Sequence, residues 1–235
     1  MNLRREIANL LWPNCTCPIC GAKLADDLLC RTCRQTLNGL QNCPHCAGFI
    51  PNESCESHSC PRIPETTAML ACFPYTAELR ERLRLLKYYH KAQIAATFGN
   101  LLAARWRDFA TADAQADAIV PVPLYHARFA ERGYNQSELL AVTLGRELQI
   151  PVYAHAIKRT KNTKAQHSLT FKERADNLHN AFAAGADLPK VKGKRIILLD
   201  DIITTGATIR GCVEVLQAGG AAAVYALAVA GHLSK

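Results

Sequence analysis

Apolar and polar positions in the second half of the chain follow two different periods, and the pattern predicts an α/β fold. Residues 196–199 form a short continuous apolar run, as in a parallel strand that is covered on both faces. Residues 209–218 have helical spacing, Gly219 and Gly220 stop the helix, and residues 221–230 are again apolar. These segments predict one βαβ unit.

The same patterns predict further elements upstream. Apolar runs at 68–75 and 118–122 predict strands, and residues 77–88, 92–109 and 137–149 have helical periodicity. A parallel sheet flanked by helices accounts for all of them. The longest apolar run is about half of what a bilayer requires, so we expect no membrane segment.

Two carboxylates and a loop of small residues follow the apolar run at 196–199. Because burying unpaired carboxylates costs several kcal/mol, we expect the strand to end at Asp200 and Asp201. They would then project where open α/β sheets bind ligands. Small side chains leave backbone N–H groups free to surround an anion at the start of the next helix. Those residues are Thr204, Thr205, Gly206, Ala207 and Thr208. Hydroxyls at the carboxylates and a phosphate at the loop describe a ribose 5-phosphate.

This run resembles the signature of the type I phosphoribosyltransferases. The resemblance implies that Asp200 and Asp201 hold the ribose hydroxyls of phosphoribosyl pyrophosphate, that Thr204 to Thr208 hold its 5-phosphate, and that Mg²⁺ bridges pyrophosphate and ribose. It also implies a pyrophosphate loop at Val122 and Pro123. An ordinary capped strand-turn-helix corner is the alternative. Several proteins of this fold bind the ligand as a regulatory signal, so the match alone does not establish turnover.

Residues 158–174 carry six Lys or Arg side chains against Glu173 alone. The segment is either a solvated surface loop or a flap that closes over a triply anionic ligand; we favour the flap. In a transferase, positive groups would stabilise the departing pyrophosphate. The candidates for this role are Arg128, Arg132, Arg159 and Lys164. No general base is identified by the sequence, so the acceptor stays unnamed.

Eight of the 11 cysteines lie within residues 17–60, mostly in Cys-x-x-Cys pairs. Such a pair suits one side of a tetrahedral Zn²⁺ site, and two pairs complete it. We therefore expect one or two structural zinc ions in a module over residues 1–64, followed by a phosphoribosyltransferase-like domain over 65–235. The proposed ligands are Cys17, Cys20, Cys30 and Cys33, then Cys43, Cys46, Cys55 and Cys60.

The alternative for these cysteines is a disulfide framework in a secreted domain. The first 13 residues lack a signal peptide, so we expect a reducing, cytoplasmic location instead. Cys55 and Cys60 are less regularly spaced, and His58 could substitute for one of them. Pairing in sequence order is our expectation, and an interleaved arrangement stays open. Cys15, Cys72 and Cys212 are expected to be small buried apolar residues.

The predicted helix at 77–88 is basic, and the chain has a net charge of +8. A charged helix face is usually only solvated. Two separate basic segments and a zinc module nevertheless make single-stranded DNA a reasonable partner, with tyrosines as candidate stacking surfaces. The candidate contacts are Arg84, Lys87, Tyr88 and Lys91.

The whole chain resembles the ComF family of competence and DNA-utilisation proteins, which join an amino-terminal double zinc ribbon to a phosphoribosyltransferase domain. Besides the cysteine pairs and the acidic run, the resemblance rests on the following motifs: Leu86-Lys87-Tyr88, Pro121-Val122-Pro123, Arg132-Gly133-Tyr134-Asn135-Gln136, and the spaced set Arg159, Thr160, Gln166, Arg174 and Asn177. It implies a cytoplasmic role in natural competence, where imported single-stranded DNA is handled.

Three hypotheses follow. The chain is a phosphoribosyltransferase, a non-catalytic ligand-binding factor that handles DNA, or an adaptor that docks onto other DNA-uptake proteins. Intact carboxylates beside an anion loop argue against a pure scaffold. Glutamine-dependent amidophosphoribosyl transfer is not expected, because the amino terminus is occupied by cysteine pairs instead of a glutaminase domain.

Overall fold

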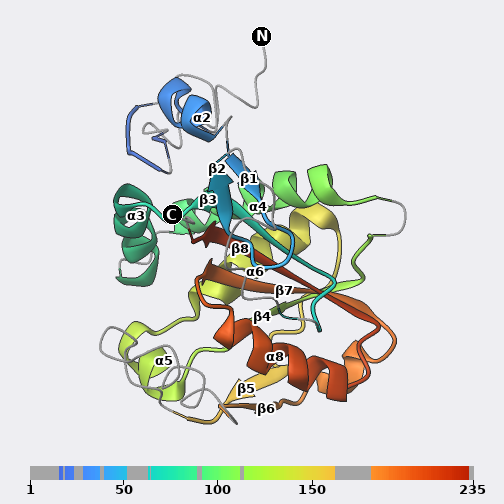
Figure 1. The fold of residues 1–235 in the computed structure, drawn as a ribbon. Helices are drawn as coiled ribbons and strands as arrows, with labels where there is room; N and C mark the ends of the chain where they lie inside the picture. Colours follow the sequence, from blue (N-terminus) through green and yellow to red (C-terminus); the bar gives the residue numbers. More distant parts are fainter. Residues whose placement is uncertain are drawn as a thin grey trace.

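A parallel sheet is the centre of the fold. The computed structural model describes residues 16–17, 19–23, 29–37, 40–51, 63, 65–88, 92–111, 114–161 and 181–232. Strands β3 (Ala68–Pro74), β8 (Ala223–Gly231), β7 (Arg195–Ile203) and β4 (Ala118–Pro121) lie in that order (Figure 1), and every neighbouring pair is parallel. A single bridge from Ile119 to Val152 extends the sheet beyond β4. The predicted α/β class is confirmed.

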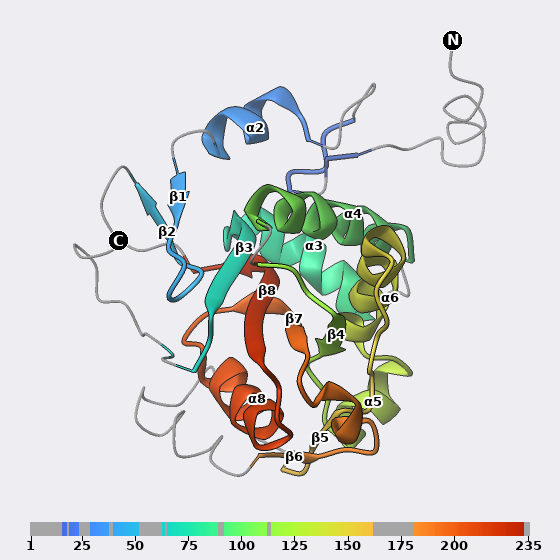
Figure 2. The same cartoon turned by 90° about the vertical axis from the view of Figure 1, so that its right-hand side faces the viewer.

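Helices cover both faces of the sheet (Figure 2). On one face lie α3 (Ala77–Tyr88), α4 (Ala92–Phe109) and α6 (Gln136–Leu148). On the other lie α8 (Ala207–Ala218) and an antiparallel hairpin of β5 (Ile157–Arg159) and β6 (Phe182–Ala184). Alternate side chains of β7 serve the two faces: Ile196 and Leu198 pack with α8, while Ile197 and Leu199 pack with α4 and α6.

Most predicted elements match the observed ones. The helices expected at 77–88 and 92–109 are α3 and α4, and the βαβ unit is β7, α8 and β8. Several short elements were not anticipated, among them α5 (His126–Arg132), the strands β5 and β6, and a 3₁₀ turn (Leu188–Val191) that leads into β7. The end of β7 was predicted wrongly, because the strand runs through Asp200 and Asp201 to Ile203.

The amino-terminal part packs against the sheet. Helix α2 (Arg31–Leu37) is followed by a hairpin of β1 (Leu40–Asn42) and β2 (Phe49–Pro51), which lies beside β3 in Figure 2. Ala47 and Phe49 belong to the same apolar cluster as the sheet face under α8. The Met69 N–H donates to the Pro44 carbonyl at 2.7 Å. The predicted division at residue 64 is therefore crossed by core contacts.

In the part of the chain that the structure describes, no helix combines the length and the apolarity that a bilayer crossing requires.

Candidate functional site

The acidic pair lies at the carboxyl end of β7 and is nearly buried. Asp200 is 9% exposed and Asp201 6%, so both are more enclosed than we expected. Burial is possible because Asp200 Oδ1 accepts hydrogen bonds from Ser137 Oγ at 3.2 Å and from the Asp201 N–H at 2.8 Å. The penalty for burying an unpaired carboxylate therefore does not apply to Asp200, and the strand can continue past it.

The loop of small residues connects β7 to α8. Gly206 has φ +72°, and a Cβ there would lie 2.8 Å from Ile63 Cδ1, so both conformation and space require glycine. Among the described residues, no backbone carbonyl accepts from the N–H groups of Thr204, Thr205 or Gly206. Ala207 and Thr208 begin α8. Free N–H groups at a helix start suit the anion that the sequence predicts for this loop.

One of the predicted arginines approaches the acidic pair. Arg159, on β5, is half-buried, and its guanidinium lies 5.5 Å from the Phe182 ring centre. Desolvation lowers the pKa of Arg159, the charge of Asp200 opposes this, and Arg128 adds to it. Arg159 therefore interacts through its charge with both Asp200 and Arg128. Lys164 lies outside the described residues.

The predicted pyrophosphate loop follows β4. Val122 and Pro123 are buried, and the Val122 N–H donates to the Leu199 carbonyl at 2.8 Å, which ties the loop to β7. Asn135 Nδ2 donates to the Val122 carbonyl at 3.0 Å. Arg132 is buried at the end of α5 and donates to Gln136 Oε1 at 3.1 Å.

Sequence reasoning assigned no role to Asn135 and did not single out Ser137. The only available signal was that Asn135 belongs to a family motif and that Ser137 follows it directly. Their partners, Val122 and Asp200, are 13 and 63 residues away, so the contacts depend on the folded chain.

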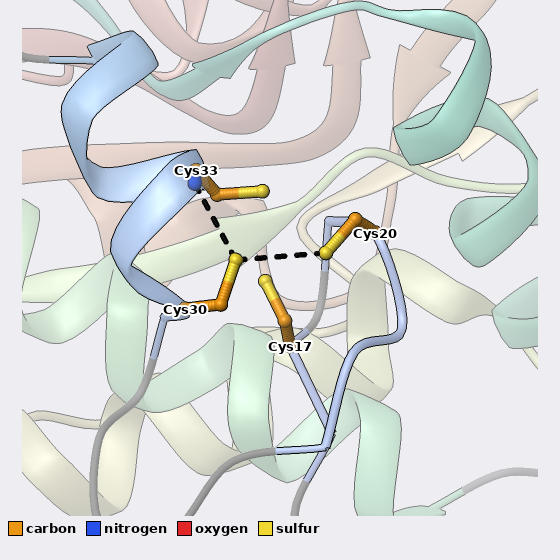
Figure 3. Close-up of side chains that lie close together, drawn as sticks. All are labelled: Cys17, Cys20, Cys30 and Cys33. Carbon is orange, nitrogen blue, oxygen red and sulfur yellow. Dashed lines mark hydrogen bonds between the residues drawn. The ribbon is translucent and has the colours of Figure 1, made fainter.

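Four cysteines come together in front of α3. The sulfurs of Cys17, Cys20, Cys30 and Cys33 (Figure 3) all lie within 4.8 Å of one another. The Sγ atoms of Cys20 and Cys30 are 3.6 Å apart. Tetrahedral Zn²⁺ with Zn–S bonds of about 2.3 Å requires sulfurs about 3.8 Å apart, so this four-cysteine cluster fits the ion. Burial and the neighbouring thiols raise the pKa of Cys33, which a bound cation would reverse.

The second cysteine pair is held differently. Cys43 and Cys46 lie within a tight turn, residues 43–48, which we call the second cysteine turn. Both thiols are buried. A Cβ on Gly48 would lie 2.6 Å from His232 Nε2 and 3.2 Å from Cys46 Sγ, so the His232 ring lies beside this turn. The other expected ligands, Cys55 and Cys60, and the alternative His58 lie outside the described residues.

Of the remaining cysteines, Cys212 is buried as predicted, whereas Cys72 is only half-buried. Burial raises the pKa of Cys72 to about 12, with Arg105 opposing. Burial also raises the pKa of Cys212, and the charge of Asp200 adds to it. Neither thiol is activated as a nucleophile. Cys15 lies outside the described residues.

The basic helix is α3. Arg84 is exposed and forms an ion pair with Glu81 at 3.6 Å, while Leu86 accepts a hydrogen bond on its carbonyl from the Tyr134 hydroxyl. Lys87 and Tyr88 belong to the last turn of α3, but their side chains and Lys91 lie outside the described part of the chain. A surface ion pair of this kind is weak, so Arg84 can exchange Glu81 for another anion.

Comparison with known proteins gives one domain and a set of relatives. Residues 100–235 match the model of the phosphoribosyl transferase domain. Competence protein F of Haemophilus influenzae is 32% identical over 209 residues, which cover 87% of this chain and 91% of that protein. The DNA utilization protein YhgH of Escherichia coli is 32% identical over 200 residues, covering 83% and 87%.

A solved structure also matches part of the chain. It is the glutamine phosphoribosylpyrophosphate amidotransferase from B. subtilis, complexed with ADP and GMP. The match has 18% identity and a TM-score of 0.39, and covers 60% of this chain and 29% of that one.

Proposed function

This chain belongs to the ComF family of competence and DNA-utilisation proteins, and from that premise we propose that it binds phosphoribosyl pyrophosphate with Mg²⁺ and contacts single-stranded DNA during DNA uptake. The observation that carries the proposal is a buried pair of carboxylates on one strand, followed directly by a glycine-dependent anion loop at a helix start. The two features suit the ribose hydroxyls and the 5-phosphate of one ligand.

The charges around the acidic pair support the same ligand. Phosphoribosyl pyrophosphate combines a diol with two strongly anionic groups, so its site needs acceptors and cations in close proximity. Asp200 and Asp201 supply acceptors for the hydroxyls. Arg159 lies close enough to interact electrostatically with Asp200 and with Arg128, and the two arginines supply positive charge for the pyrophosphate. In a transferase, the same charge would stabilise pyrophosphate as it leaves.

Two metal ions belong to the proposal. The two carboxylates and the ligand's own oxygens form a hard oxygen donor set suited to Mg²⁺, which would neutralise charge on the pyrophosphate. The four-cysteine cluster suits structural Zn²⁺. Ligation by thiolates requires reduced cysteines, which agrees with a cytoplasmic role.

Pyrophosphate release tests the ligand and separates enzyme from binding factor. Zinc-loaded protein is incubated with Mg²⁺ and phosphoribosyl pyrophosphate, with and without single-stranded DNA. The double variant Asp200→Ala/Asp201→Ala is the control for the site. Asp187→Asn removes an acid that precedes the 3₁₀ turn before β7 and pairs with Lys190, and it is the control for charge. Release that only the double variant loses supports an enzyme.

Direct titration decides the case in which no pyrophosphate is released. If wild-type protein binds the ligand without turnover, the non-catalytic DNA-handling hypothesis is favoured. If wild-type protein does not bind it in Mg²⁺, the proposed ligand is wrong.

The DNA contact is tested through charge. Arg84→Glu/Lys87→Glu should weaken single-stranded DNA binding and flatten its dependence on salt, because fewer counterions are released. Arg146→Glu, an exposed charge reversal on α6, is the control and should change much less. An affinity that added salt does not reduce would contradict the basic contacts.

A further inference from the structure

The start of α6 and the residue before it touch two parts of the proposed ligand site, the predicted pyrophosphate loop at Val122 and the acidic pair on β7. Asn135 is 7% exposed and Ser137 1%, although both side chains are polar. Buried polar side chains are retained where their hydrogen bonds are satisfied, and both residues bond to groups far from them in sequence. Their hydrogen-bond partners, Val122 and Asp200, indicate what the two side chains do.

Asn135 links the pyrophosphate loop to a helix. Its Nδ2 donates to the Val122 carbonyl at 3.0 Å, and its Oδ1 accepts from the Ser137 N–H at 3.1 Å as the N-cap of α6. One planar amide therefore fixes the backbone of the loop relative to the start of a 13-residue helix. Loss of the donor would release the loop while leaving the cap to be replaced by another acceptor.

Ser137 links the same helix to the acidic pair. Its hydroxyl donates to Asp200 Oδ1, the oxygen that also accepts from the Asp201 N–H. Rotation of the carboxylate would break both hydrogen bonds, so the two donors together fix its orientation. The direction in which Asp200 presents its other oxygen is thus set by a side chain on a different element.

We propose that Asn135 and Ser137 are positioning residues for the two halves of the ligand site: Ser137 orients Asp200 toward the ribose hydroxyls, and Asn135 holds the Val122 loop for the pyrophosphate. This inference rests on the proposed function. It assigns each half of the ligand to a separate hydrogen bond, so the two halves can be weakened independently.

Two probes separate the halves: ribose 5-phosphate and inorganic pyrophosphate, each titrated calorimetrically into zinc-loaded full-length protein in Mg²⁺. Ser137→Ala should lower the affinity for ribose 5-phosphate by about tenfold, which is the scale of one hydrogen bond to a charged group. The affinity for pyrophosphate should stay within about twofold of the wild-type value. Asn135→Ser keeps an N-capping residue and a neutral side chain but shortens the donor, and it should give the opposite pattern.

Two controls make the result specific. Tyr134→Phe removes the hydrogen bond to the Leu86 carbonyl within the same segment and should change neither probe. In an Asp200→Ala background, which removes the acceptor of the Ser137 hydroxyl, Ser137→Ala should have no further effect, because Ser137 acts through Asp200. Equal weakening of both probes, or of neither, overturns the inference. Binding of neither probe, nor of phosphoribosyl pyrophosphate, by wild-type protein overturns the proposed function and the inference with it.

Discussion

The two Cys-x-x-Cys regions share a sequence spacing but are held to the rest of the molecule in different ways. The four-cysteine cluster has its sulfurs gathered for one ion, and it meets the rest of the chain through side chains such as Arg82, against which Gly21 lies. The second cysteine turn is hydrogen-bonded to the sheet: Pro44 accepts from Met69, and the Phe49 N–H donates to the His232 carbonyl at 2.8 Å.

The difference shows that the same motif can depend on metal to different degrees. Among the described residues, Ile19 and Leu29 of this region pack against the apolar core but are only partly buried, so we expect its structure to depend mainly on the bound ion. The second turn shares the apolar core through Ala47 and Phe49, so part of its stability comes from the sheet. Each of the following experiments perturbs one region and uses the other as its reference.

Removal of metal should give the largest difference in hydrogen-exchange protection between the two regions. Structural Zn²⁺ contributes on the order of 10 kcal/mol in small zinc domains, so a chelator should abolish hydrogen-exchange protection over residues 16–33. The amides of Cys43, Ala47 and Phe49 should keep part of their protection, because each donates to a carbonyl within the turn or, for Phe49, to that of His232 just after β8. Exchange is followed by mass spectrometry before chelation, after it, and after zinc is restored. Equal loss in both regions would contradict the comparison.

Gly231→Ala should damage the second turn without touching the cluster. A Cβ at Gly231 would overlap the carbonyl oxygen of Ala47, and backbone cannot move aside cheaply, so we expect a loss of about 3 kcal/mol in unfolding free energy. Gly48→Ala is the matched control, because its new Cβ meets the His232 ring, which can rotate. Urea unfolding measures both variants. A larger effect of Gly48→Ala would reverse our account of which contact is rigid.

Asn42→Ala should loosen the second turn by about 2 kcal/mol, because it leaves buried groups unpaired. Asn42 Nδ2 donates to the Ala47 carbonyl at 2.9 Å, and its Oδ1 accepts from the Ala71 N–H at 3.2 Å. Faster exchange of the Ala71 amide, with an unchanged visible spectrum of the Co²⁺-loaded cluster, is the expected result. A changed Co²⁺ spectrum would mean that the two regions are coupled.

Arg82→Ala should have a smaller effect, confined to the packing of the four-cysteine cluster against α3. The guanidinium lies against Gly21 on a partly exposed surface, and such contacts contribute about 1 kcal/mol or less. We expect unchanged zinc content by elemental analysis and faster proteolysis near the cluster. Arg107→Ala, which removes an exposed pair with Glu147, is the control. Loss of zinc would show that the helix face helps to form the metal site.

A fall in pH should have the smallest effect of all on the stability of the sheet. It should release zinc from the four-cysteine cluster at a higher pH than the one at which the sheet loses stability. The Arg195 guanidinium lowers the pKa of Asp117 from its ordinary 3.8 to about 2. Stability from this pair is complete above pH 3.8 and is lost as the pH falls toward 2, and solvent screening keeps it below about 1 kcal/mol. Thiolates release zinc at higher pH than this. An acid titration that follows zinc and near-ultraviolet dichroism separately checks the order, and Asp117→Asn should remove only the later step.

Local pattern was enough to predict most of the sheet and its helices. The ranges 77–88 and 92–109 were correct because an amphipathic period defines a helix without knowledge of its neighbours. Asp200, Asp201 and the Thr204 to Thr208 loop were placed at a strand end by the same local logic.

The errors come from contacts between distant residues. The strand carrying Asp200 was expected to stop there because the sequence does not reveal the hydroxyl of Ser137, 63 residues earlier, that makes burial possible. His232 was not associated with the second cysteine turn because it follows β8, and only the folded sheet brings β8 beside residues 43–48. Such pairs cannot be read from periodicity.

The attachment of the second cysteine turn also determines what pairs with the exposed backbone edge of the outermost strand. Strand β3 is the border of the sheet, and the unused backbone groups of a border strand are a template for joining strands of other molecules. Here the N–H groups of Met69 and Ala71 donate to Pro44 and Asn42. The cysteine-rich segment thus acts as a built-in blocker of self-association, and a shortened chain that began at β3 would be prone to form aggregates.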